Sequence, residues 1–579
     1  MPTVPGNSLL KKIKNVVIGK DLDLGDRSVF HKLSLIAFFA WVGLGADGLS
    51  SSCYGPSEAF LALGSHTHLS VFVALATGLT IFVISASYSQ IIEHFPTGGG
   101  GYIVASKLLS PTVGMVSGCA LLIDYALTIT LSVASGADAV FSFLPEAWLS
   151  YRLDVALFGV ILLIVLNLRG VKESVMVLVP VFMVFLITHA IAIGYGFAVH
   201  SGDLGGQVAH IAEGVSVAKT QLGLWGMILL ILHSYSMGAG TYTGIEAVSN
   251  GLPILREPKV QTGKRTMVYM AVSLAVTVMG LMFAYILFKV GEQPGKTLNA
   301  VLFESITGAW PQPWGSAFVL VTLVSEALLL FVAAQAGFLD GPRVLSNMAL
   351  DRWFPTRFAM LSDRLVTKNG ILLMGASAFF LMVVTKGAVD ILIVLYSINV
   401  FITFVLSQLG MVKHWWQDRG SAAHWRKGLA LNGLGLALCS FILVTVVIVK
   451  FEEGGWATVL VTSALAALAW YTKRHYNQTW EQLKQLDVLV EAAKIPSHPD
   501  MASRQPGKAK ELDTNARTAV LLVNGYNGLG LHTLGTIMRY FERDFENFIF
   551  IQVGQVDASI FKTSEELEQE FHCIRAAIA

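Results

Sequence analysis

Charged residues are scarce in this chain of 579 amino acids. Asp, Glu, Lys and Arg make up only 14% of it, against roughly 25% in soluble globular domains. Hydrophobic residues make up 54%, and the mean hydropathy is +0.62. This composition excludes an ordinary soluble domain and indicates a protein whose solvent is the lipid bilayer. The net charge of +1 gives no indication of a nucleic-acid partner, and we expect none.

Cysteine is also rare, and its spacing excludes the usual roles of clustered cysteines. The four residues lie singly, without CxxC or CxxxH spacing: Cys53, Cys119, Cys439 and Cys573. The sequence therefore predicts neither a disulfide framework nor a zinc site. We expect no cofactor, and a function other than that of an enzyme.

No cleavable signal peptide is predicted either. The first apolar stretch, Leu9 to Ile18, is short and amphipathic, which is typical of a helix that lies on the membrane surface. We assign it to a cytoplasmic N-terminal segment, residues 1–32.

Long apolar runs fill most of the remaining chain. A helix needs about 20 mostly apolar residues to cross the roughly 30 Å hydrocarbon core. Twelve such spans are predicted: Leu33–Leu63, Leu69–Ile91, Gly114–Phe143, Asp154–Leu168, Ser174–Ala198, Leu222–Leu252, Met267–Val290, Ser316–Leu339, Gly370–Val384, Asp390–Val412, Leu429–Val449 and Trp456–Tyr471. The fold class is therefore an all-α polytopic membrane protein, with residues 33–471 forming a transporter domain.

Basic residues set the orientation of these spans, because cytoplasmic loops retain Lys and Arg during insertion. Six of them precede the first span, whereas the loop Gly64 to Leu69 that follows it has none. Further Lys and Arg follow the fourth, sixth, eighth and tenth spans. We therefore expect both termini to be cytoplasmic, in a plasma (inner) membrane.

Two spans are interrupted by glycine, hydroxyl and carboxylate residues, at Gly45–Ala59 and Gly238–Ala247. They open two sets of five spans, and the second set begins on the opposite side of the membrane. This arrangement predicts a 5+5 inverted repeat followed by two more spans. Interrupted spans in corresponding positions of two halves indicate the substrate site of a secondary transporter.

The composition changes after the last span. Residues 472–517 are polar and contain three prolines, which predicts a linker. Residues 518–579 read as a small cytoplasmic α/β (βαβ) tail: a strand at Thr518–Val523, a helix at Leu529–Phe541, a strand at Asn547–Val553 and the start of a helix at Ser564–Ile578. A two-stranded sheet cannot bury its faces alone. We expect a homodimer through this tail; packing on the membrane domain, or a continuation of the chain, are the alternatives.

The first interruption carries a carboxylate, Asp47, together with Ser50, Ser51, Ser52 and Tyr54. Backbone leaves the helix at membrane depth only where it lines a cavity. A carboxylate there predicts a functional site, and a capped helix end is the alternative.

Asp124, Thr128 and Ser132 are spaced i, i+4, i+8 and form one polar stripe on the third span. Hydroxyl back-bonding within the helix is the alternative for each hydroxyl alone. Three further candidates lie in the second interruption and the tenth span: Thr241, Thr243 and Tyr396. For Tyr396 the alternative is a packing aromatic. Such oxygen ligands suit a hard cation, and a divalent ion would usually have more carboxylates, so we expect a monovalent one.

Several motifs resemble one family of transporters. Asp47–Pro56 resembles the first span of the KimA-type potassium importers and matches the Asp-to-Tyr spacing of the wider Kup family. Pro96–Tyr102, Leu122–Thr128 and Thr243–Gly251 resemble the entry to their third span, that span and their sixth. The resemblance covers about Lys32 to Trp416, within the amino acid-polyamine-cation (APC) superfamily.

This resemblance implies a LeuT-like inverted-repeat fold, potassium uptake by proton symport and a cytoplasmic tail. It also implies K⁺ ligands, carried over residue by residue: Asp47, Tyr54, Asp124, Thr128, Ser132, one of Thr241 and Thr243, and Tyr396. The tail is shorter than the family pattern, so the resemblance lends no support to nucleotide regulation through it.

A proton-coupled amino acid or polyamine permease is the alternative function. Half-helix amino termini, with their positive dipole ends, normally hold an amino acid carboxylate, and Asp47 in that turn would repel it. Acidic residues would suit a polyamine. The candidates for the proton carrier are Glu326, His189 and Asp47. Histidine titrates near neutral pH, although a packing role is the alternative for His189.

Overall fold

The computed structural model describes residues 35–96, 98, 100–169, 175–362, 366–420, 424–490, 516–523, 527–541 and 544–552. The predicted amphipathic helix at Leu9–Ile18 and the predicted helix start at Ser564–Ile578 lie outside these residues. Contacts divide the chain into two compact units, and the division falls between Ala467 and Leu468.

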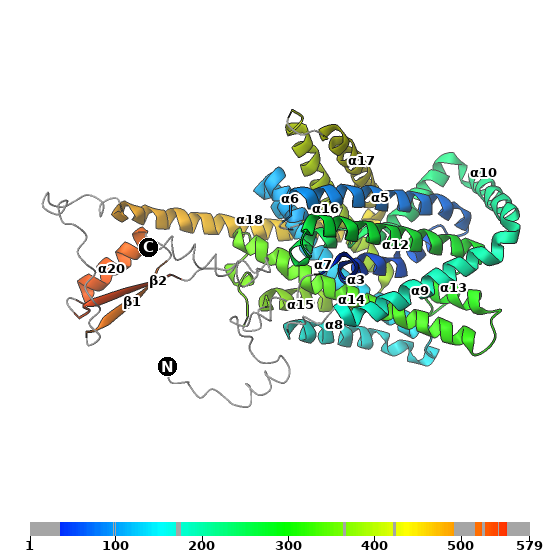
Figure 1. Cartoon of the computed structure of the whole chain (residues 1–579), viewed down its shortest axis with the longest axis horizontal. Helices are drawn as coiled ribbons and strands as arrows, with labels where there is room; N and C mark the ends of the chain where they lie inside the picture. Colours follow the sequence, from blue (N-terminus) through cyan, green and yellow to red (C-terminus); the bar gives the residue numbers. More distant parts are fainter. Residues whose placement is uncertain are drawn as a thin grey trace. The chain divides into compact units, whose positions relative to one another are not determined.

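The first unit is a bundle of long helices that run alongside one another (Figure 1). The helices are α3 (Ala37–Ser50), α4 (Gly55–Leu61), α5 (Ser70–His94), α6 (Gly100–Leu108), α7 (Pro111–Phe141), α8 (Arg152–Leu168), α9 (Val175–His200), α10 (Leu204–Met237), α11 (Ala247–Asn250), α12 (Lys259–Leu287), α13 (Leu298–Thr307), α14 (Trp314–Leu350), α15 (Lys368–Thr385), α16 (Val389–Gln417) and α17 (Trp425–Lys450). A further helix, α18 (Trp456–Lys484), begins in this unit and ends in the second. The fold of this unit is therefore helical, as predicted.

Ten helical stretches in the described part of the chain are long and apolar enough to cross a membrane. The first predicted span is not among them because it is divided into α3 and α4. The last two predicted spans form one continuous stretch, Trp425–Val490. The expectation of a polytopic, mostly helical membrane protein is confirmed, and the number twelve stays a prediction.

Three helical segments were not predicted. α6 and α13 are too short to give a span-length apolar run. α10 begins 18 residues before the predicted span at Leu222, and a left-handed residue, Gly223 (φ 68°), kinks it at that point. A length criterion finds membrane spans and misses helices of this kind.

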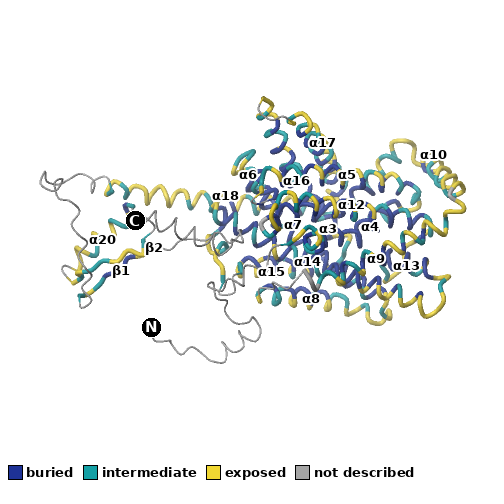
Figure 2. Tube along the Cα trace, in the orientation of Figure 1, coloured by how far each residue is buried: buried dark blue, intermediate teal, exposed yellow. Residues whose placement is uncertain are grey.

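The helix α7 lies at the centre of the first unit. It packs against α14, α16, α15 and α8, and most of its residues are buried. Figure 2 shows buried residues along α7, α3 and α14, with exposed residues on outer helices such as α10. Polar side chains on α7 are therefore held inside protein rather than lipid.

Both predicted interruptions are present. α3 ends at Ser50, and the 3-10 turn η1 (Ser51–Cys53) separates it from α4, which carries Pro56 in its first turn. The serine hydroxyls satisfy carbonyls three residues earlier, as Ser50 Oγ does with Asp47 O at 2.7 Å. α10 ends at Met237 and is followed by the 3-10 turn η5 (Gly238–Tyr242) and the short α11.

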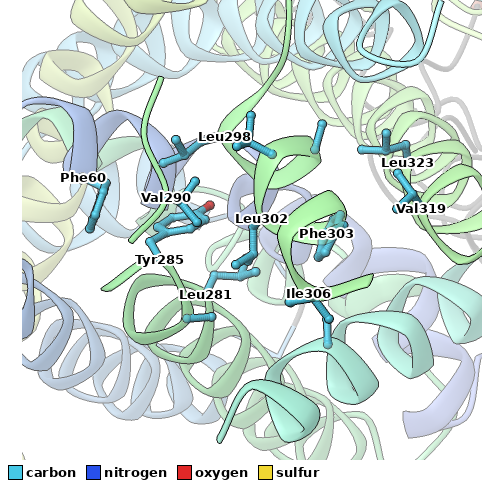
Figure 3. Close-up of a cluster of buried hydrophobic side chains, with 14 of the residues drawn as sticks. Phe60, Leu281, Tyr285, Val290, Leu298, Leu302, Phe303, Ile306, Val319 and Leu323 are labelled. Atoms are coloured by element: carbon cyan, nitrogen blue, oxygen red, sulfur yellow. The ribbon is translucent and has the colours of Figure 1, made fainter. Parts of the chain in front are cut away.

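A cluster of large apolar side chains fixes α4 and α13 beside α12 and α14 (Figure 3). Phe60 of α4 packs against Tyr285 of α12 with ring centroids 5.2 Å apart. Phe303 of α13 and Leu323 of α14 are fully buried in the same cluster. Close packing of these side chains holds the short helix α13 in place.

The second unit contains β1 (Thr518–Val523), α20 (Gly528–Tyr540) and β2 (Asn547–Gln552), at the positions predicted for them. The strands pair in parallel, with Val520 opposite Ile549. Asn527 caps α20 by accepting from Gly530 N at 2.9 Å. α18 continues as helix to Lys484, beyond residue 472, where the composition predicts that a linker begins. The sequence Lys473–Lys484 contains neither Gly nor Pro to end the helix.

Candidate functional site

The two interruptions touch each other. Ser51 Oγ lies 3.0 Å from the carbonyl oxygen of Thr241. Gly244 has φ +77°, and a Cβ added to it would lie 2.5 Å from Gly48 N. Only glycine allows this backbone conformation and this close approach. The unwound parts of the two helices therefore form one layer in the interior of the bundle.

Tyr54 and the two threonines lie within this layer. A Cβ added to Gly55 would be 2.1 Å from Thr241 Oγ1, so the Thr241 side chain faces the start of α4. Thr243 Oγ1 donates to Gly240 O at 2.9 Å and lies beside Tyr54. Of the threonine pair, Thr243 is the one whose hydroxyl lies next to the tyrosine.

The stripe on α7 faces this layer. Thr128 Oγ1 lies 3.0 Å from Asp124 O and 3.0 Å from the Tyr396 hydroxyl. Back-bonding and a contact across helices are thus both present at Thr128. Gly240 lies between the two tyrosines: an added Cβ would be 3.2 Å from Tyr54 Cε2 and 3.8 Å from Tyr396 Cδ1.

The structure therefore brings together six of the eight predicted ligands, all of them buried: Asp47, Tyr54, Asp124, Thr128, Thr243 and Tyr396. Thr241 contributes its backbone oxygen to the Ser51 contact. Ser132 is buried one turn beyond Thr128, and within the described residues no hydrogen bond links it to the other seven.

Two carboxylate oxygens at this place lack a hydrogen-bond partner within the described residues. They are Asp124 Oδ1 and Glu246 Oε2, and both are buried. Asp47, Asp124 and Glu246 lie within electrostatic range of one another. A buried carboxylate oxygen without a partner is costly, so these oxygens fit a site that receives a cation.

Glu246 is a residue whose role the sequence interpretation missed. It follows Thr243 and Gly244 in the second interruption, where the pattern Tyr242-x-x-x-Glu246-Ala247 matches Tyr54-x-x-x-Glu58-Ala59 in the first. A glutamate in an interrupted span was the available signal. In the described part of the chain, no three acidic, histidine or cysteine side chains form a cluster that could hold a metal ion, so any cation here would have mixed hydroxyl, carbonyl and carboxylate ligands.

A network of polar side chains lies near Glu246, within electrostatic range of it. Arg343 contacts Asp340 Oδ1 at 3.3 Å and donates to Asn250 O at 3.3 Å. Asn250 Nδ2 donates to the Tyr125 hydroxyl at 2.7 Å. This network joins α14, α11 and α7.

Two of the predicted proton carriers, Glu326 and His189, are in direct contact. His189 Nε2 lies 3.0 Å from Glu326 Oε1, and both side chains are buried. His189 Nδ1 lies 2.8 Å from Phe185 O, and because a carbonyl only accepts, Nδ1 carries the hydrogen. The Nε2–Oε1 contact then requires one shared proton, which is bonded either to His189 Nε2 or to Glu326 Oε1.

Asn299 links this pair to the first interruption. Its Nδ2 donates to Glu326 Oε1 at 2.7 Å and lies 3.5 Å from Cys53 O. The third candidate, Asp47, has no such connection among the described residues and belongs to the broken-helix layer.

A cavity of about 240 Å³ reaches both groups of residues from the side predicted to be extracellular. Tyr54 and Glu326 form part of its lining, together with Glu58 of α4 and Asp138 of α7. The first broken helix and Glu326 thus line one vestibule.

Interrupted helices in a polytopic bundle, with polar groups at the breaks, define a membrane transporter. Residues 33–469 match the amino acid permease family, and the chain belongs to that family, within the APC superfamily. It is a transporter and not an enzyme.

Two curated relatives are similar over most of the chain. The potassium transporter KimA of Bacillus subtilis is 30% identical over 489 residues, which cover 83% of this chain and 77% of KimA. The low-affinity putrescine importer PlaP of Escherichia coli is 21% identical over 424 residues, covering 69% of this chain and 85% of PlaP. The similarity to KimA confirms the resemblance seen in the motifs.

Among solved structures, the manganese transporter of Eremococcus coleocola matches with a TM-score of 0.41 and 13% identity. The match covers 80% of this chain and 99% of that one.

The contact between Gly55 and Thr241 predicts that Gly55→Ala destabilises the protein. The added methyl group overpacks the contact at 2.1 Å, which typically costs about 1–3 kcal/mol, so the melting temperature in detergent should fall. Gly194→Ala in α9 is the matched control, because its Cβ would meet no atom within 4 Å. Equal melting temperatures for the two variants would show that Thr241 can move aside.

Proposed function

We propose that this chain imports potassium together with protons, by alternating access at the layer between the two broken helices. The observation that carries the proposal is Asp124 Oδ1, a buried carboxylate oxygen without a partner in the described residues, beside the Thr128 and Tyr396 hydroxyls. The proposed ligands are the predicted ones: Asp47, Tyr54, Asp124, Thr128, Ser132, Thr241 or Thr243, and Tyr396. The similarity to KimA supports potassium as the substrate.

The neutral ligands favour a monovalent ion. Hydroxyl oxygens from Tyr54, Thr128 and Tyr396 carry no full charge, and only Asp47 and Asp124 among the proposed ligands do. Divalent cations usually take more carboxylates in direct contact. Soft metal ions prefer thiolate or imidazole ligands, which the proposed ligand set does not contain.

The carboxylates also give a reason for proton coupling. Asp47, Asp124 and Glu246 lie near one another in a buried layer, and like charges at such distances cannot all be ionised at low cost. One monovalent cation compensates one of them. A proton bound to a second carboxylate lowers the remaining charge, so cation and proton would favour each other's binding.

We propose that Glu246 holds this proton, because its Oε2 has no partner in the described residues. The Glu326–His189 pair is the second candidate. The contact between its two members requires one proton, Glu326 lines the outer vestibule, and Asn299 connects Glu326 with the broken helix.

A polyamine importer is the alternative function. PlaP is named as a putrescine importer, and the same carboxylates would attract ammonium groups. Against this, there is little room beside Gly240: a Cβ added there would lie within 4 Å of both Tyr54 and Tyr396. An extended diamine needs more room than a single ion.

The finer topology forms part of the proposal. We propose twelve crossings in a 5+5 inverted repeat plus two, with both termini on the cytoplasmic side of the plasma (inner) membrane. The paired breaks after α3 and α10 support the repeat, and the distribution of Lys and Arg supports the orientation.

We also propose a homodimer through the cytoplasmic tail. In the parallel pair β1 and β2, Val520, Leu522, Ile549 and Ile551 share one face. They are 57%, 76%, 36% and 42% exposed, whereas Ala519 and Leu521 on the other face are buried. A second copy of the same face would cover these apolar side chains.

The first prediction tests the substrate. Asp124→Asn should lower rubidium affinity by at least about tenfold, a loss of 1.4 kcal/mol or more, because it removes a charge from the site while keeping its size. In proteoliposomes, potassium should compete with rubidium uptake, whereas putrescine and arginine should not. Micromolar inhibition by putrescine would favour the polyamine function; normal uptake by Asp124→Asn would remove Asp124 from the site.

The second prediction concerns coupling. Glu246→Gln, which resembles a permanently protonated side chain, should retain rubidium binding but lose the stimulation of uptake by an inward proton gradient. Glu213→Gln, at an exposed position of α10, is the matched control. If Glu326→Gln loses this stimulation and Glu246→Gln keeps it, the proton resides on the Glu326–His189 pair.

The third prediction concerns the tail. Leu522→Asp places a charge on the uncovered face of the sheet and should convert the full-length dimer to monomers, measured by light scattering in detergent. Thr533→Asp adds the same charge on the exposed side of α20 and should leave the dimer intact. A Leu522→Asp variant that stays dimeric would place the interface elsewhere.

A further inference from the structure

The outer vestibule contains a carboxylate that neither the fold nor the proposed ion site uses. Glu58 of α4 lines the cavity of about 240 Å³. Within the described residues its side chain has no hydrogen bond and no ion pair. Three other carboxylates line the same cavity: Asp138, Glu292 and Glu326.

Apart from Glu292, the other charged side chains that line the cavity contact a charged or titratable partner. Arg152 Nη1 pairs with Asp138 Oδ1 at 2.9 Å, and Glu326 contacts His189. Lys296 Nζ pairs with Glu304 at 2.7 Å. Negative charge therefore exceeds positive charge among the side chains that line this cavity. Within the described residues Glu58 has no ion pair, and Glu292 is exposed.

A buried hydroxyl in the same wall is also without a partner. Ser135 of α7 is 5% exposed, lines the cavity, and its Oγ makes no hydrogen bond within the described residues. Other hydroxyls of α7, at Thr128 and Thr130, bond to the carbonyl four residues earlier. Ser135 lies one turn before Asp138, so its free oxygen and that carboxylate are on the same face of the helix.

We propose that Glu58, Ser135 and Asp138 form an outer binding site for a hard monovalent cation, upstream of the ion site between the broken helices. This inference rests on the proposed function, which supplies the cation. The ligands are one free carboxylate, one hydroxyl and one carboxylate shared with Arg152, all facing a cavity large enough for a partly hydrated ion. Tyr54 lines the inner end of the cavity, so an ion leaving this site meets the first broken helix.

The outer site concentrates cations before they enter. A cleft with an excess of charge of one sign and low-dielectric walls focuses the field and raises the local concentration of counter-ions by about 10-fold or more. The buried ammonium of Lys450 lies within electrostatic range of Glu58, but it donates to Ser397 Oγ at 2.8 Å on α16. It therefore opposes the site only from a distance.

Rubidium binding to the full-length protein, with uptake in parallel, tests the proposal. The wild type should bind two ions for each chain, one tightly and one weakly, and Glu58→Gln should bind only the tight one. In uptake, Glu58→Gln should raise KM by on the order of tenfold with kcat unchanged, because capture and not translocation is weakened. Ser135→Ala, which removes a neutral ligand, should shift KM in the same direction by less.

Two further variants separate the possible results. Asp124→Asn should lose the tight ion and keep the weak one, and Glu146→Gln, at an exposed position of the adjoining loop, should resemble the wild type. One bound ion in the wild type, or two in a folded Glu58→Gln, would overturn the outer site while leaving the proposed function intact. No rubidium binding by the wild type would overturn both.

Discussion

The structure depends on one constraint: backbone that leaves a helix inside the bilayer must find its hydrogen bonds within the protein. Two helices break at the same depth here, and each break helps to satisfy the other. Serine hydroxyls after α3 occupy carbonyls of their own turn, and Ser51 also reaches Thr241 O across the contact. The glycines at 48 and 244 let the two backbones approach closely enough. The groups proposed to bind the central cation lie on these two breaks or on α7 and α16.

Charge imposes the second requirement on the same layer. Protein interiors tolerate a carboxylate when a cation, a proton or hydrogen bonds compensate it. The structure uses hydrogen bonds at the Asp340–Arg343 pair and a shared proton at Glu326–His189. At Asp124 and Glu246 it leaves an oxygen of each without a partner in the described residues, and the proposed transport cycle is a sequence of ways to compensate those oxygens.

Local sequence was sufficient for the features that local chemistry determines. Glycine, serine and proline residues predicted the break at Gly45–Ala59. Helical spacing predicted the polar stripe of Asp124, Thr128 and Ser132 on α7. Contacts between distant segments were not available in this way. His189 and Glu326 are 137 residues apart, and nothing in either span indicates the other. Asn299 lies on α13, a helix too short to be recognised by its length. The sequence alone does not show that an oxygen of Glu246 lacks a partner among the described residues.

The Ser51 hydroxyl has a consequence for how the layer can move. Its oxygen lies 2.5 Å from Gly48 O within its own helix and 3.0 Å from Thr241 O in the other, but a hydroxyl has a single hydrogen to donate. Rotation about one bond transfers that hydrogen from the contact between the helices to the turn within α3. In the proposed transport cycle, the two broken segments would therefore separate without the loss of a hydrogen bond at Ser51.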